Sequence, residues 1–263
     1  MGAISVKVYI SCDMEGVSGI VDWRQVTFSD PASAQGRRLA TLDLNAVVEG
    51  ALAGGATEVV AWDGHGNFPG SLDPAILHPG CRLVMNGGDG GMVGFDASYA
   101  ALLFSGLHSM AGAPGGVLAH SFTRQIASFA VNGIAMGEIG LTMLVAGAFG
   151  VPAVFLAGDA AAVHEAQALV PGLEGVAVKE GLSPRGVLVR APALARQEIT
   201  AGAARAVAKA RQIAPYTLPA PYRMTTRWRT PADALRDAGR PGARLVDQFT
   251  VEVMVNDLRT FSG

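Results

Sequence analysis

The sequence is poor in cysteine and in long apolar runs, and each shortage excludes a class of protein. Its two cysteines, Cys12 and Cys81, form neither a C-x-x-C pair nor a zinc-finger spacing. We therefore expect free thiols in a reducing compartment rather than a disulfide scaffold. No apolar run approaches the ~20 residues that span a bilayer, and the first residues lack the basic region and apolar core of a signal peptide. These absences predict a soluble, cytoplasmic protein without a membrane partner.

Charge is also scarce. Charged residues make up 16% of the 263 residues, whereas about a quarter is usual in soluble domains. The net charge of −2 offers no electrostatic footprint for nucleic acid or acidic membranes, so neither is expected as a partner. Half of the residues are hydrophobic and 34 are glycines, which is typical of a tightly packed α/β protein. So little charged surface also predicts a homo-oligomer, in which copies of the chain cover part of one another.

The order of the predicted elements indicates the fold. A strand-like run over residues 4–10 is followed by a helix that begins at Asp30-Pro31 and ends before Gly54-Gly55. A short buried strand over 57–62 comes next, and this alternation is the signature of a parallel sheet with crossover helices. We therefore predict an α/β fold with a central, largely parallel sheet flanked by helices. Further predicted strands span 82–85, 101–105 and 151–156, and further helices span 138–150 and 159–169.

The pattern changes beyond about residue 180. An alanine-rich helix begins at Pro192, and the alternating runs over 222–228 and 249–255 are typical of strands. We predict a catalytic α/β domain over residues 1–180 and a smaller C-terminal α+β lobe over residues 181–263.

Two carboxylates stand where the first predicted strand gives way to a glycine-rich loop. Asp13 and Glu15 are two residues apart, and side chains two apart on an extended backbone point to the same side. In open α/β sheets this rim is where ligands bind. Solvated turn residues would explain the pair equally well, so the choice between the two interpretations depends on the residues that accompany it.

Further polar residues follow other predicted elements. His65 and His108 lie at strand ends, His120 lies in an apolar run, and Glu138 opens a helix. Imidazoles and carboxylates are ligands of zinc. Together with the acidic pair, they exceed what one zinc ion needs, and the surplus is explained if one carboxylate bridges two metal ions. His120 is then left as an acid, base or nucleophile.

Each of these residues also has an ordinary structural explanation. His65 stands between two glycines of a turn, His108 suits the end of a strand, and His120 suits a hydrogen-bonded core histidine. Glu138 is favoured at a helix N-terminus by about 0.3–1 kcal/mol. Spacing along the sequence does not show that the candidates converge.

Motifs of other enzyme classes are incomplete or absent. Gly64-x-Gly66 and Gly88-x-Gly90 do not complete the dinucleotide-binding G-x-G-x-x-G, since Pro69 stands where the third glycine after Gly64 belongs. The sequence contains neither the G-x-x-x-x-G-K-[ST] loop nor the G-x-S-x-G elbow of α/β hydrolases. A nucleotide site and a serine nucleophile are therefore disfavoured.

Five short segments stand in a fixed order along the chain: S-C-D-M-E-G-V-S-G from residue 11, D-G-H from 63, G-L-H from 106, P-G-G-V-L-A-H-S from 114 and G-E-I-G-L from 137. Together they resemble the bacterial zinc D-aminopeptidases of the DppA type, and the resemblance covers most of the chain. Arg37, Thr41 and Asn45 on the first predicted helix also fit the pattern of that family.

The resemblance implies a site with two Zn²⁺ ions per subunit. Its metal ligands fall on Asp13 as the bridge, on Glu15 and His65 for one ion, and on His108 and Glu138 for the other. The catalytic histidine of the family falls on His120. The family also implies a ring-shaped homo-oligomer, a decamer, with active sites that face an internal channel.

The residues and the resemblance together lead to one functional hypothesis. We expect a di-zinc aminopeptidase that hydrolyses short peptides from the N-terminus, with D-amino-acid peptides, such as those of D-alanine, as the small-peptide substrate. Two alternatives stay open at this point: a non-catalytic relative that binds zinc or a peptide, and a two-metal esterase or phosphatase.

Overall fold

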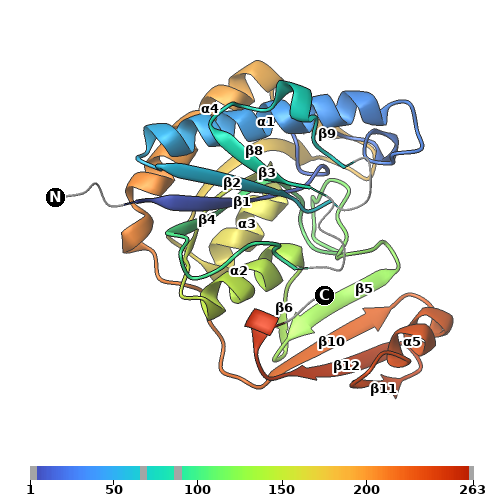
Figure 1. Cartoon of the computed structure of the whole chain (residues 1–263). Coiled ribbons are helices and arrows are strands. Elements are labelled where there is room, and N and C mark those ends of the chain that lie inside the picture. Colours follow the sequence, from blue (N-terminus) through green and yellow to red (C-terminus); the bar gives the residue numbers. More distant parts are fainter. Residues whose placement is uncertain (1–4, 66–69, 86–90, 261–263) are drawn as a thin grey trace.

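A seven-stranded sheet organises the larger part of the computed structural model, which describes residues 5–65, 70–85 and 91–260 (Figure 1). Its strand order is β3-β2-β1-β4-β7-β8-β9. All neighbouring strands run parallel except β8 and β9, which pair antiparallel. The strands span Lys7–Cys12 (β1), Glu58–Asp63 (β2), Cys81–Val84 (β3), Ala101–Leu107 (β4), Ala153–Asp159 (β7), Glu174–Gly181 (β8) and Val187–Val189 (β9).

Helices cover both faces of this sheet, as Figure 1 shows. Helices α1 (Ser33–Ala53) and α4 (Pro192–Ala208) pack on one face, and α2 (Glu138–Ala148) and α3 (Ala160–Leu169) pack on the other. The two-residue period of β1 divides its side chains between the layers. Val8 and Ile10 join the core under α1 and α4, whereas Tyr9 joins the core under α2 and α3.

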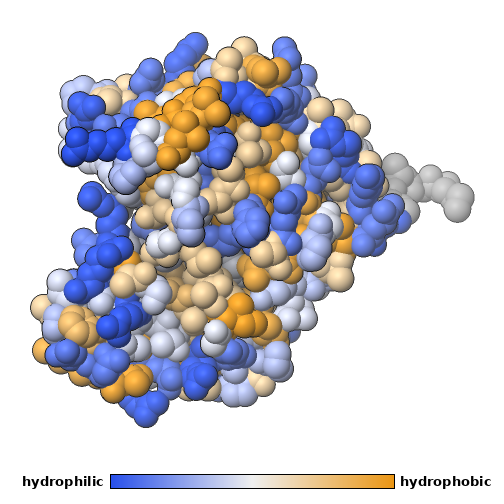
Figure 2. Space-filling model, turned by 180° about the vertical axis from the view of Figure 1, so that it is seen from behind, coloured by the Kyte–Doolittle hydropathy of each residue, from blue (hydrophilic) through white to orange (hydrophobic). Residues whose placement is uncertain are grey.

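A second, antiparallel sheet lies beyond α2, with strand order β11-β12-β10-β5-β6. Its strands pack against α2 through a third apolar cluster, which includes Phe129 of β5, Met224 of β10 and Leu144 of α2. In Figure 2 the outline of the molecule is indented between the parts that contain the two sheets. The elements span Ile126–Val131 (β5), Ile134–Ala135 (β6), Tyr222–Trp228 (β10), Ala243–Asp247 (β11), Thr250–Val255 (β12) and Pro231–Ala238 (α5). Short 3₁₀ helices span Trp23–Gln25, Pro74–Ile76, Ala210–Gln212 and Leu258–Thr260.

The predicted fold class is confirmed: a largely parallel sheet lies between helices, and a separate smaller sheet accompanies it. The two sheets do not divide the chain at residue 180. Strand β9 and helix α4 lie after that position yet belong with the large sheet, while β5 and β6 lie before it and belong to the small one. Whether residues 1–180 and 181–263 form separate units remains a prediction.

Most element boundaries fall within a few residues of those expected, and the exceptions have physical causes. Helix α1 begins at Ser33 rather than at Pro31, because the Asp30 carboxylate first accepts the backbone N–H of Ala32 in a turn. The Asn132-Gly133 pair is a hairpin signal, and both residues take positive φ angles, 53° and 83°, between β5 and β6.

Other expectations concern the cysteines, the membrane and the glycine-rich motifs. Cys12 and Cys81 are free thiols, as predicted, and both are buried. Within the described ranges, no helix combines the length and apolar character needed to cross a membrane. Gly66 and the Gly88-x-Gly90 motif lie outside the described residues.

Candidate active site

The candidate ligands meet because of the strand order. Asp13 follows β1, His65 follows β2 and His108 follows β4. Strand β1 lies between β2 and β4, and all three run parallel, so their carboxyl ends share one edge of the sheet. Asp13 therefore stands between the two histidines, where each of its oxygens faces a different one.

Two glycines allow the backbone to come this close. A Cβ on Gly16 would lie 1.9 Å from the carbonyl oxygen of Leu107. A Cβ on Gly106, whose φ is +76°, would lie 2.4 Å from the carbonyl oxygen of Asp13. The Gly16 N–H instead donates to the Gly106 carbonyl at 2.7 Å. Only glycine fits both positions, so the loop after β1 is pressed against the end of β4.

Carboxylate and imidazole groups approach one another closely in this space. His65 Nδ1 lies 2.8 Å from Asp13 Oδ1 and 3.2 Å from Glu15 Oε2. His108 Nε2 lies 3.3 Å from Asp13 Oδ2 and 3.5 Å from Glu138 Oε1. The structure thus brings together all five residues that the sequence analysis selected as metal ligands.

His65 Nδ1 is hydrogen-bonded to Asp13 Oδ1, but two other atoms of the group are unsatisfied. Within the described part of the chain, the buried atoms Glu15 Oε2 and His108 Nε2 have no hydrogen-bond partner of good geometry. Orphaned buried polar atoms are costly, and side chains that aim at a common point rather than at each other are typical of metal ligands. The potential ligand atoms form two groups, and within each group they lie within 4.8 Å of one another. One group is Asp13 with Glu15 and His65, and the other is His108 with His120 and Glu138. Carboxylate and imidazole donors suit zinc, so the residues present fit the ion.

The second nitrogen of each histidine is held by the backbone. His65 Nε2 lies 3.1 Å from the carbonyl oxygen of Val26, and His108 Nδ1 lies 2.9 Å from that of Ser109. A carbonyl oxygen only accepts, so each of these nitrogens carries the proton. Once the opposite nitrogens lose their protons, they present a lone pair toward the carboxylates, the arrangement that outer contacts impose on metal-binding histidines.

The electrostatics of the metal-free site favour a cation. Burial opposes the charge of His65, but the Asp13 and Glu15 carboxylates beside it outweigh burial and raise its pKa to about 11. Burial likewise opposes a charge on His108, and the nearby Glu138 and Asp13 carboxylates hold its pKa well above the usual value. The pKa of Asp13 is well below its usual value, because the two histidines beside its carboxylate, His108 and His65, outweigh burial. The carboxylates therefore hold positive charge between them, and metal binding at these atoms would displace the protons.

His120 occupies a strained loop between β4 and β5. Its ring stacks on that of His108, with centroids 4.0 Å apart and planes at 13°. Its Nδ1 lies 3.0 Å from the carbonyl oxygen of Leu118, which leaves Nε2 available. Leu118 and Phe122 have φ angles of 56° and 59°, which non-glycine residues rarely adopt and which cluster at functional sites. The residues around His120, which form an apolar run in the sequence, therefore adopt a loop in the structure.

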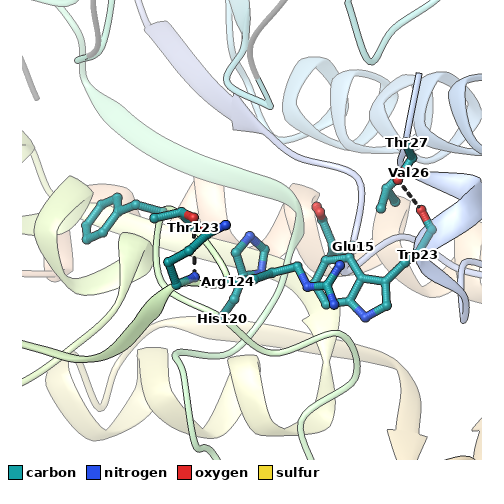
Figure 3. A pocket seen from close by; sticks show the side chains of 9 residues that line it. Glu15, Trp23, Val26, Thr27, His120, Thr123 and Arg124 are labelled. Atoms are coloured by element: carbon teal, nitrogen blue, oxygen red, sulfur yellow. Dashed lines mark hydrogen bonds between the residues drawn. The ribbon is translucent and has the colours of Figure 1, made fainter. Parts of the chain in front are cut away.

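A cleft of about 270 Å³ opens beside these groups (Figure 3). The edge of Trp23 meets the His120 ring at a centroid distance of 5.4 Å, and the Arg124 guanidinium lies 4.6 Å from the Trp23 ring centroid. Figure 3 shows Glu15, His120, Trp23 and Arg124 around the same opening. The cleft is lined by Glu15, Trp23, Val26, Thr27, His120, Phe122, Thr123, Arg124 and Gln125.

A buried lysine, absent from the sequence-based candidates, holds the loop that carries Glu15. Lys179 on β8 donates from Nζ to the carbonyl oxygens of Glu15, Val17 and Ile20, at 3.0 Å for Val17. Burial lowers its pKa to about 8, against the favourable charges of Asp159 and Glu15. Sequence reasoning missed Lys179 because β8 was not among the predicted strands, and it missed Trp23 and Arg124 because neither belongs to a motif.

The three residues of α1 that fit the family pattern hold the segment after β2 in place and are not part of the metal site. Arg37 Nη2 donates to the Leu72 carbonyl, and Asn45 Nδ2 donates to the Ile76 carbonyl. The Thr41 hydroxyl accepts the backbone N–H of Asp73. These bonds attach the segment after β2 to α1 rather than line the cleft.

The fold and the site together define a class: an α/β protein with a carboxylate–histidine candidate metal centre at the carboxyl edge of its parallel sheet. The chain belongs to the peptidase M55 family, described as D-aminopeptidase, whose model matches residues 6–262. It is 34% identical over 218 residues to a D-aminopeptidase from Bacillus subtilis (strain 168), a match that covers 81% of this chain and 78% of that protein.

A solved structure is similar along nearly the whole chain. It is the Zn-dependent D-aminopeptidase DppA from Bacillus subtilis, described as a self-compartmentalizing protease. The TM-score is 0.89 at 30% sequence identity, with 97% of this chain and 93% of that chain covered. The family and the fold expected from the sequence are thereby confirmed.

Proposed function

We propose that this protein is a zinc aminopeptidase that removes N-terminal residues from short peptides, with D-amino-acid peptides as its substrate class. The observation that carries the proposal is the position of Asp13, whose two carboxylate oxygens face His65 and His108. Membership of the D-aminopeptidase family and the likeness to a Zn-dependent relative support it.

The proposed centre holds two zinc ions per subunit. Asp13 bridges them, Glu15 and His65 bind one ion, and His108 and Glu138 bind the other. The two separate groups of ligand atoms, each within 4.8 Å, support a count of two. The orphaned Glu15 Oε2 and His108 Nε2 atoms, one on each side of Asp13, support it as well.

In the proposed reaction His120 moves the proton. Zinc in such a site supplies Lewis acidity, which polarises a carbonyl and lowers the pKa of water. The Leu118 carbonyl holds the Nδ1–H of His120, so its Nε2 is the atom that accepts a proton from the attacking water and passes it to the leaving amine. The Leu118 carbonyl and the stacked His108 ring fix the position of this imidazole.

We further propose that the protein acts as a homo-oligomer, a decamer, in the cytoplasm. The description of the similar structure as a self-compartmentalizing protease supports an assembly with enclosed sites. The low content of charged residues and the two free, buried thiols are consistent with this proposal. Light scattering of the purified protein measures the size of the assembly, and a monomer would contradict the proposal.

Metal analysis combined with a substrate panel tests the function. We expect two zinc ions per subunit, hydrolysis of D-alanyl dipeptides faster than of their L-counterparts, and loss of activity with a chelator that added zinc restores. Esters and phosphate monoesters in the same panel test the two-metal alternatives. Zinc binding without hydrolysis of any peptide would instead identify a binding protein.

A further inference from the structure

Among the described residues, the Arg124 guanidinium at the cleft has no acidic partner. The structure pairs most of the arginines of the small sheet and its surroundings with acids, for example Arg244 with Glu252 at 2.8 Å. The Arg124 guanidinium, by contrast, makes no ion pair or hydrogen bond within residues 5–65, 70–85 and 91–260. It lies over the face of Trp23 instead, with Cζ 4.6 Å from the ring centroid.

This stacking fixes the guanidinium while leaving its donors free. A guanidinium held over an aromatic face keeps its N–H donors available to bind a carboxylate in bidentate fashion. Arg124 shares the cleft with His120 and Glu15. The same opening therefore presents a proton-transfer group on one side and an unpaired fork of donors on the other.

The distances match a short peptide. The Trp23 ring lies 5.4 Å from the His120 ring and 4.6 Å from the guanidinium carbon, so the last two groups are about 10 Å apart or less. An extended peptide rises about 3.3–3.6 Å per residue, and a charged N–H···O contact adds about 2.8 Å. This upper bound accommodates one or two residues beyond the scissile bond.

We propose that Arg124, oriented by Trp23, binds the C-terminal carboxylate of the peptide and thereby selects dipeptides and tripeptides. The inference depends on the proposed aminopeptidase function, in which His120 protonates the leaving amine. The leaving residues then extend from His120 toward Arg124, and their free carboxylate reaches the guanidinium. A peptide with an amidated C-terminus presents no charge to this group.

The test compares a D-alanyl dipeptide with its C-terminal amide. It uses the zinc-loaded wild type, Arg124→Gln, which removes the charge, and Arg124→Lys, which keeps the charge and loses the fork. Arg211→Gln removes the same charge from an exposed residue that does not line the cleft. We expect Arg124→Gln to raise KM for the free dipeptide by roughly 10- to 100-fold, since charged hydrogen bonds are worth about 1.5–3 kcal/mol. KM and kcat for the amide stay within about twofold, Arg124→Lys is intermediate, and Arg211→Gln behaves as wild type.

Other outcomes separate this inference from the proposed function. Equal losses on acid and amide would overturn it, because they assign Arg124 to the shape of the cleft. An unchanged KM for both substrates would also overturn it. A smaller assembly of the Arg124→Gln variant would overturn it as well, because it would mean that Arg124 pairs with an acidic group of a neighbouring subunit. If the wild type cleaves both substrates, each of these results leaves the aminopeptidase function intact. If the wild type cleaves neither, the function itself fails, and the inference fails with it.

Discussion

Charged side chains differ in burial and pairing between the rim of the large sheet and the outer side of the small sheet. At the rim, Asp13, Glu15 and His108 are almost fully buried, and two of their polar atoms lack a hydrogen-bond partner among the described residues. On the small sheet, pairs such as Arg244 with Glu252 are partly solvent-exposed and well matched in distance. Exposed pairs contribute little to stability, whereas buried and unmatched groups are costly. A metal ion bound there, as proposed, would offset this cost at the rim.

The largest test of this contrast removes the shared carboxylate. Asp13→Ala leaves both histidines without their common partner, so we expect loss of both zinc ions. The fall in kcat/KM should exceed the ~100-fold typical of losing an outer-shell contact. Metal analysis of the purified variant is the measurement. Two zinc ions per subunit in that variant would show that Asp13 is not the bridge.

The second test separates proton transfer from metal binding. His120→Ala should lower kcat by about 10²- to 10⁴-fold, as loss of a general acid–base group does, while two zinc ions remain bound. Kinetics and metal content are measured on the same preparation. Zinc loss would instead place His120 in the ligand set together with His108 and Glu138, with which its ring nitrogens are already grouped.

The third test concerns the buried cation that supports the rim. Lys179→Met keeps the length of the side chain but leaves three buried carbonyl oxygens without their donor. We expect the free energy of unfolding to fall by about 3 kcal/mol and zinc affinity to weaken by about 10- to 100-fold. Chelator competition and urea unfolding measure the two effects. If zinc affinity is unchanged at reduced stability, Lys179 supports the fold alone.

The smallest effect is expected on the other side of the comparison. Arg244→Ala breaks an exposed pair on the small sheet, where 72% of the arginine side chain is accessible. Its free energy of unfolding should change by less than about 1 kcal/mol, with zinc content and kcat/KM as in the wild type. A larger change in the free energy of unfolding, measured with urea, would mean that this exposed pair contributes to stability as much as a buried one.

The sequence predicts the members of the site but not their meeting. Asp13, His65 and His108 were each recognised at the end of a predicted strand, because apolar runs that end in glycine-rich loops are visible along one chain. That β1 lies between β2 and β4 is not visible there, because strand order results from the packing of helices on both faces. The convergence had to come from the family resemblance or from the structure.

Other features leave no signal in the sequence. Glycine or asparagine in a sequence predicts left-handed backbone, as at Asn132-Gly133. Leu118 and Phe122 also adopt positive φ angles, although their residue types do not predict it. The loop around His120 was therefore read as an apolar run. Strand β8 was missed because Lys179 interrupts its apolar residues, although its side chain points inward to three carbonyl groups. A single Arg124 in a loop forms no pattern at all.

The segment between β4 and β5 starts in one sheet and finishes in the other. His108 belongs to its first end, anchored in the large sheet, and Arg124 to its last, which leads into the small one. The proposed metal ligand and the proposed selectivity residue are therefore attached to different sheets. Changes to the small sheet in the course of evolution can retune which peptides are accepted while the ion-binding residues stay where they are.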